Sequence, residues 1–296
     1  MYVSGEEVRA NKRNSVLLVG VFILSIAGLA AIYGYMEGNL FVYFSVTAII
    51  TGIYLLINFL TYRRTIKRAI DGIKVEEGSY SKEYRKLYHL TKGLSVSAGI
   101  KMPEVYVIPT QIPNAFATGF TPDDGIVGVT EGLLEMLDDH ELEGVLAHEI
   151  AHIVNYDIRL KAVGVALGSS LMLVAELFLR KQVGRRSSGR VALVGLGLFF
   201  AARLISSLTN MAISRQREYL ADATAVRISS YNEGLASALE KIGRFSYKGG
   251  KTEYETELGG SNLMSSYIGN HFNPVSAYFS THPPIGDRVK RLRGMI

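Results

Sequence analysis

The 296-residue sequence predicts an α+β membrane protein with an N-terminal transmembrane hairpin and a polar domain into which a second apolar helix pair is inserted. Three observations support this prediction: two long charge-free runs near the N-terminus, short strand patterns between residues 104 and 130, and two weaker apolar stretches after residue 160. Hydrophobic residues make up 48% of the chain and charged residues 20%, but they are unevenly distributed. This unevenness excludes a simple soluble protein.

The hairpin is predicted over residues 1–62. Residues 14–36 and residues 38–62 contain no charged side chain, and each run exceeds the roughly 20 residues needed to cross a bilayer. The short Met36–Asn39 segment between them is typical of a tight turn. A secretory signal peptide would have a shorter apolar core and a small-residue cleavage site, so we expect two spans rather than a signal.

Basic residues flank both ends of the hairpin and predict its orientation. They are Arg9, Lys12, Arg13, Arg63, Arg64, Lys67 and Arg68. The positive-inside rule therefore predicts that the N-terminus and the chain from residue 63 onward lie in the cytoplasm, on a multi-pass protein of the cell membrane. This topology also explains the net charge of +5 and the pI of 9.2. Without an Arg/Lys stripe with interleaved aromatics, we expect no nucleic-acid partner.

The polar domain is predicted from two segments, residues 63–160 and 212–296. Strand patterns occupy residues 104–108, 114–119 and 126–130, and helical patterns occupy residues 81–94 and 131–137. Asp138 with Glu141 three residues later is a capping box, which predicts a further helix running to about Tyr156. The chain has no Cys, so disulfides and thiolate metal sites are excluded.

The second apolar pair is predicted over residues 161–211. Its charge-free stretches are short, because Ala162–Ala175 ends at Glu176 and Val191–Ala202 ends at Arg203. If each helix tolerates one ionisable residue, both can cross the membrane, and this interpretation is favoured over re-entrant or buried helices. Two crossings place the basic loop at residues 180–190 outside, against the positive-inside rule.

The segment His148-Glu149-Ile150-Ala151-His152 indicates a metal site. Histidines at i and i+4 lie on one helix face, so both neutral imidazoles can reach one zinc ion that keeps an open position. Glu149 lies about 100° around the helix and can take a proton from a water molecule at the metal and pass it to a leaving amine. A chain of this composition would contain the pattern by chance about 0.008 times. The alternative is a pair of histidines that line a core helix.

The best candidate for a third protein ligand is the segment Arg217–Asp222. Glu218 and Asp222 are again i and i+4, so one carboxylate can bind zinc while the other holds the free N–H of a ligand imidazole. The alternative is an exposed helix face with solvated charges. In that case the third ligand would be sought among Glu233, His271 and His282.

The sequence resembles the HtpX-like membrane zinc metalloproteases over essentially its whole length. These proteases are relatives of the CAAX prenyl proteases. The resemblance rests on the N-terminal hairpin, Asn114–Gly119, the HExxH with Asn155 and Asp157 after it, Glu218 to Asp222, and Thr281-His282-Pro283. It implies a zincin-like protease domain of the gluzincin type with a small sheet and an active-site helix. It also implies one Zn²⁺ per chain, with Glu218 as the third ligand and Glu149 as the catalytic base. In this resemblance Asp222 orients a zinc-bound His.

The resemblance also implies a substrate-binding edge strand that pairs with an extended substrate backbone. Its residues are Asn114, Ala115, Phe116, Ala117, Thr118 and Gly119. His282 and Arg288 are implied to lie near the site, where one of them steadies the oxyanion as a catalytic residue. In the alternative interpretation, His282 caps the final helix and Arg288 pairs with a carboxylate. Asn155 and Asp157 are expected to close the active-site helix.

We therefore expect a membrane-anchored zinc endopeptidase that hydrolyses peptide bonds of membrane or misfolded proteins, with proteins, peptides and the lipid bilayer as partners and the number of protomers left open. Both halves of the site must lie on one membrane side, within roughly 30 Å of its surface, so the chain between them crosses twice or not at all. An intramembrane protease is disfavoured by the charges of Asp138, Asp139 and Asp157 around the motif. The alternative from another class is a catalytically idle membrane adaptor with a structural zinc.

Overall fold

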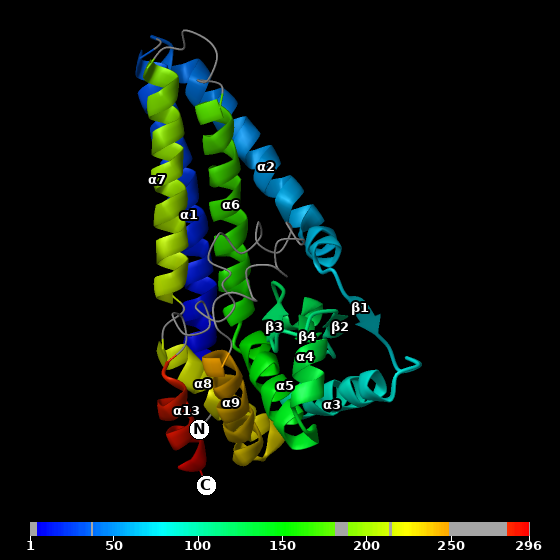
Figure 1. Cartoon of the computed structure of the whole chain (residues 1–296). Helices are drawn as coiled ribbons and strands as arrows, with labels where there is room; N and C mark the ends of the chain where they lie inside the picture. The colour runs from blue at the N-terminus through cyan, green and yellow to red at the C-terminus, as the bar shows by residue number, and fades with distance from the viewer. Residues whose placement is uncertain (1–4, 37, 181–188, 213–214, 249–282, 296) are drawn as a thin grey trace. The chain divides into compact units, whose positions relative to one another are not determined.

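The computed structural model describes residues 5–36, 38–180, 189–212, 215–248 and 283–295. The chain divides into two compact units, whose elements are labelled in Figure 1. The α+β unit comprises Met1–Lys12, Arg68–Arg159 and Ile213–Ile296, and the helical unit comprises Arg13–Lys67 and Leu160–Ala212. Residues 5–12 are thus grouped with the α+β unit.

The helical unit is built from long helices that match the predicted apolar segments. They are α1 (Gly5–Met36), α2 (Leu40–Ala69), α6 (Asp157–Arg180) and α7 (Gly189–Ala212). The turn between α1 and α2 needs glycine at two positions. Gly38 adopts a φ of 72°, and a Cβ on Gly34 would lie only 2.9 Å from the Cα of Leu40. The chain can therefore reverse within a few residues, as the sequence predicts.

Helix α2 exposes an apolar surface along its length. None of its Leu40–Arg68 segment is buried, and Phe41 and Phe59 are 80% and 72% exposed. A core helix of a soluble protein would be mostly buried, and an apolar surface of this size in water is unfavourable. Among the described residues, Val8–Ile32 and Leu40–Arg68 are long and apolar enough to cross a bilayer, while the Gly195–Ile205 stretch of α7 is shorter. Lipid is therefore the environment that suits the surface of α2.

The α+β unit contains a four-stranded mixed sheet. Its strands are β1 (Ile73–Val75), β2 (Glu104–Ile108), β3 (Ala115–Thr118) and β4 (Ile126–Thr130), in the order β1-β2-β4-β3. The central pair β2 and β4 is parallel, and both outer pairs are antiparallel. β2, β3 and β4 coincide with the predicted strands, whereas β1 was not predicted. β3 is one edge of the sheet.

Helix α5 (Asp139–Val154) begins at the predicted capping box. The Asp138 side chain accepts hydrogen bonds from the backbone N–H groups of His140 and Glu141, both at 3.0 Å. Glu141 reaches back to the N–H of Asp138 at 2.9 Å. These reciprocal bonds satisfy donors that a helix start leaves open, and they fix where α5 begins.

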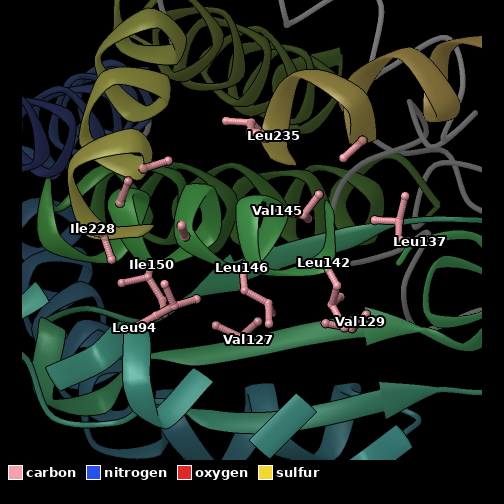
Figure 2. Packing of buried hydrophobic residues seen from close by; sticks show 14 of the residues in the cluster. Leu94, Val127, Val129, Leu137, Leu142, Val145, Leu146, Ile150, Ile228 and Leu235 are labelled. Carbon is pink, nitrogen blue, oxygen red and sulfur yellow. The ribbon is translucent and has the colours of Figure 1, made fainter. Parts of the chain in front are cut away.

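The core of the α+β unit surrounds α5. The other helices of the unit are α3 (Lys82–Ala98), α4 (Glu131–Met136), α8 (Arg215–Ser229), α9 (Asn232–Lys248) and α13 (Ile285–Arg293). In Figure 2, Leu142 and Leu146 of α5 point toward Val129 and Val127 of the sheet, and Leu235 lies on the opposite side of the helix.

Helices α5 and α9 touch at backbone level. A Cβ on Gly144 would lie 2.4 Å from the backbone nitrogen of Leu235, so the helices can approach this closely only because residue 144 is glycine. Packing on two sides holds α5 firmly in place.

The predicted α+β membrane fold, with two apolar N-terminal helices and a small sheet, is confirmed.

Candidate metal centre

Three side chains from two helices converge at the end of α5. The Nε2 atoms of His148 and His152 are 3.2 Å apart, and Glu218 of α8 places one carboxylate oxygen 3.6 Å from the first and the other oxygen 3.7 Å from the second. Ligand atoms about 2.0–2.1 Å from a tetrahedral ion are separated by about 3.3 Å, which is close to these distances. The cluster thus has the dimensions of a tetrahedral site with one ligand position left over.

Burial of the cluster also fits a cation. His148 and His152 are 6% and 4% exposed, and Glu218 is fully buried. The buried carboxylate of Glu218 lies 4.0 Å from Nη1 of Arg288, and a metal cation would add to this compensating positive charge. Two imidazoles and one carboxylate are a donor set that zinc uses in catalytic sites. The residues present therefore fit a zinc ion.

His148 is held from behind by Asp222, which lies one turn after Glu218 on α8. An Asp222 oxygen lies 3.0 Å from Nδ1 of His148, so a carboxylate stands behind the imidazole whose Nε2 lies in the cluster. Arg288 of α13 donates two hydrogen bonds to the same carboxylate, from Nε at 2.9 Å and from Nη2 at 2.6 Å. Arg288 is buried and pairs with the Asp222 carboxylate, as one of the two interpretations of this residue expects.

The ionisation of His148 and that of Asp222 depend on each other, because the two side chains are in contact. Burial lowers the pKa of His148, but hydrogen bonds to the Asp222 and Glu218 carboxylates outweigh burial and raise the pKa above its ordinary value. Burial raises the pKa of Asp222, but its hydrogen bonds with His148 and Arg288 dominate and hold that pKa below the usual range. Asp222 therefore stays ionised, and His148 gives up a proton when its Nε2 binds a metal.

His152 has a partner of the same kind that the sequence did not reveal. Oδ2 of Asp157 lies 3.0 Å from Nδ1 of His152. Asp157 was expected only to close α5 together with Asn155. Asn155 does cap α5, with its N–H bonded to the oxygen of Ala151, but Asp157 begins α6 and fixes the second imidazole.

Glu149 lies between the two histidines in the sequence and is half-buried. At about 100° per residue, its side chain leaves the helix beside the ligand face and not on it. In the described part of the chain its carboxylate has no hydrogen-bond or ion-pair partner. Glu149 is therefore available to exchange a proton.

The other predicted site residues taken up next are not members of the metal-binding cluster. Asn114 precedes β3 and donates its backbone N–H to the Thr130 hydroxyl at 2.8 Å, and the strand itself is half-buried at the sheet edge. Glu233, an alternative third ligand, forms an exposed ion pair with Arg293 at 2.6 Å. His271 and His282 lie outside the described residues.

Comparison with known proteins assigns the chain to a family. Residues 81–296 match peptidase family M48. The chain belongs to this family. The protease HtpX homologue of Dictyoglomus thermophilum is 36% identical over 296 residues, covering 98% of this chain and 94% of that protein. The HtpX homologues of Listeria monocytogenes (strain HCC23) and Streptococcus uberis are 33% and 32% identical, each covering 98% of this chain and 99% of the relative.

This M48 chain is thus a membrane metallopeptidase, and the predicted resemblance to the HtpX-like proteases is confirmed. Its His148, His152 and Glu218 cluster fits zinc. The crystal structure of S. mikatae Ste24p gives a TM-score of 0.44 at 18% identity, covering 97% of this chain and 66% of that protein.

Proposed function

We propose that this M48 peptidase is a zinc endopeptidase that hydrolyses peptide bonds of membrane or misfolded proteins. The observation that carries the proposal is the three-ligand cluster of tetrahedral dimensions beside the carboxylate of Glu149, which has no hydrogen-bond or ion-pair partner among the described residues. A structural zinc normally has four protein ligands, whereas three leave a position for chemistry.

The protein side chains have distinct roles in this proposal. His148, His152 and Glu218 would hold the zinc, which when bound supplies a Lewis acid that polarises the scissile carbonyl. Glu149 accepts a proton from the attacking water and then donates it to the leaving amine nitrogen, so the peptide bond breaks as the carboxylate forms. Asp222 and Asp157 keep the two imidazoles oriented throughout.

Edge strand β3 supports a peptide substrate. An extended segment can add to a sheet edge through backbone hydrogen bonds, which do not depend on substrate side chains. β3 packs against α5, the helix that carries the two histidines, so a segment paired with β3 would run along the metal site. Asn114–Gly119 is accordingly the proposed substrate-binding segment.

Metal dependence tests this proposal. Protein purified in detergent and stripped with a chelator is expected to lose cleavage of an unfolded protein such as casein and to regain it with one equivalent of zinc. Magnesium, which prefers octahedral oxygen sites, serves as the control and should not restore cleavage. A chain that holds one zinc and still cuts neither unfolded nor membrane proteins would be the catalytically idle adaptor instead.

We further propose that the active site faces the cytoplasm and that residues 161–211 cross the membrane twice. Residues before Arg13 and residues Arg68–Arg159 belong to the same α+β unit, which supports a hairpin whose two ends lie on one membrane side. Leu160–Ala212 lies between α5 and α8 in the chain. Because side chains of α5 and α8 meet at one site, both ends of this segment must lie on the same membrane side. Basic residues at both hairpin ends favour the cytoplasm.

Cysteine labelling tests the number of crossings, and the absence of native Cys removes background. With an impermeant thiol reagent, Ser187→Cys is expected to react in intact cells. The control Ser97→Cys, on the exposed face of α3, should react only after permeabilisation. Labelling of Ser187→Cys only from the cytoplasmic side would contradict two crossings.

A further inference from the structure

The first residues of α1 contact the metal-site helix of the same unit. Asn11 is buried, with 2% of its side chain exposed, although it lies close to the start of a helix. Its Nδ2 donates one hydrogen bond to the backbone oxygen of Asn155 and another to Oδ1 of Asp157, both at 2.7 Å. One amide therefore binds both the end of α5 and the carboxylate behind His152.

The Asp157 carboxylate links Asn11 to a metal ligand. Its Oδ2 holds Nδ1 of His152 at 3.0 Å, while its Oδ1 accepts from Asn11 and from Nη1 of Arg217 at 3.1 Å. Two donors on one oxygen fix the carboxylate plane, which leaves the other oxygen directed at the imidazole. Arg288 and Asp222 hold His148 in the same way, so each histidine has an aspartate with its own donor.

The turn that carries Asp157 needs this support. Tyr156 has a φ of 60°, in the left-handed region that residues with a Cβ rarely adopt. Such a conformation persists only where the surroundings enforce it. Lys12 places its ammonium group 4.2 Å from the centre of the Tyr156 ring, next to the Asn11 contacts. Asn11 and Lys12 thus hold all three residues of the Asn155–Asp157 turn.

We propose that Asn11 is a positioning residue of the metal centre, which acts through Asp157 to hold His152 for metal binding. The N-terminal end of α1 thereby serves the metal site in addition to leading into the apolar part of the helix. This inference rests on the proposed zinc site. Partners behind a ligand histidine typically change metal affinity by about 10–100-fold when they are removed.

Zinc affinity, measured by competition with a chromophoric chelator on metal-free protein in detergent, tests the inference without an activity assay. Asn11→Ala is expected to weaken zinc binding by about tenfold or more. The matched control Asn14→Ala lies one turn further along α1 and has no hydrogen bond to the metal-site residues in the described structure, so it should bind zinc like the wild type. The isosteric Asn11→Asp keeps the packing but opposes Asp157 with like charge, and a larger loss is expected.

A double-mutant cycle distinguishes action through Asp157 from a general structural role. In an Asp157→Ala background, Asn11→Ala should change zinc affinity by less than about twofold, because the intermediary is gone. Full additivity, unchanged affinity in Asn11→Ala, or aggregation of both Asn11 variants without metal would each overturn the role of Asn11. Failure of the wild type to bind zinc would instead overturn the zinc site itself.

Discussion

Glu149→Gln is expected to lower kcat/KM for peptide-bond hydrolysis by about a hundredfold to ten-thousandfold while leaving one zinc per chain in place. The amide has nearly the same shape as the carboxylate but cannot accept the proton of the attacking water or return it to the amine. Glu149 is not one of the three clustered ligand residues, and it has no described partner whose loss would disturb the fold. The rate should therefore fall without loss of metal.

The measurement compares cleavage of an internally quenched peptide with zinc content from elemental analysis of the same sample. Glu143→Gln is the matched control, because Glu143 is a half-buried glutamate on the same helix, before the two histidines and not among the clustered ligand residues. It should cleave at the wild-type rate. Equal activity in Glu149→Gln would mean that another group takes the proton, and zinc loss in Glu149→Gln would mean that Glu149 supports the metal.

Local sequence patterns predicted the parts of the molecule whose cause is local. The capping box at Asp138 and Glu141 set the start of α5, and charge-free length identified α1 and α2. The i, i+4 spacing placed His148 and His152 on one helix face, where their Nε2 atoms are 3.2 Å apart. In each case the signal lies within one or two helical turns of the chain.

Features that depend on distant contacts were missed. β1 has only three residues, and it forms because Ile73–Val75 pairs with β2 some thirty positions later in the chain. Three residues are too few to show the alternation of apolar and polar side chains that predicts a strand. Asp157 was read as a helix end, since nothing near it in the sequence shows that its carboxylate reaches His152. Asn11 is 146 positions from Asp157, and an asparagine before an apolar run is ordinary in composition. Such contacts require the tertiary structure.

Glu218→Ala is expected to weaken zinc binding by more than about a hundredfold, beyond the effect of losing a residue behind a ligand, because it removes one of the three proposed direct ligands. From the sequence alone, Glu218 could be either a buried metal ligand or a solvated charge on an exposed helix face, and the fold excludes the exposed face. Glu218 is fully buried, and its two carboxylate oxygens lie 3.6 Å and 3.7 Å from the histidine Nε2 atoms. Two imidazoles alone would leave half of a tetrahedral site without a protein ligand.

Glu233→Ala is the control for this ligand assignment. Glu233 was an alternative third ligand, but its carboxylate pairs with Arg293 on the surface, where an ion pair contributes little to stability. Elemental analysis and chelator competition should show one zinc of wild-type affinity in Glu233→Ala and strongly reduced zinc in Glu218→Ala. The opposite result would move the third ligand from α8 to α9.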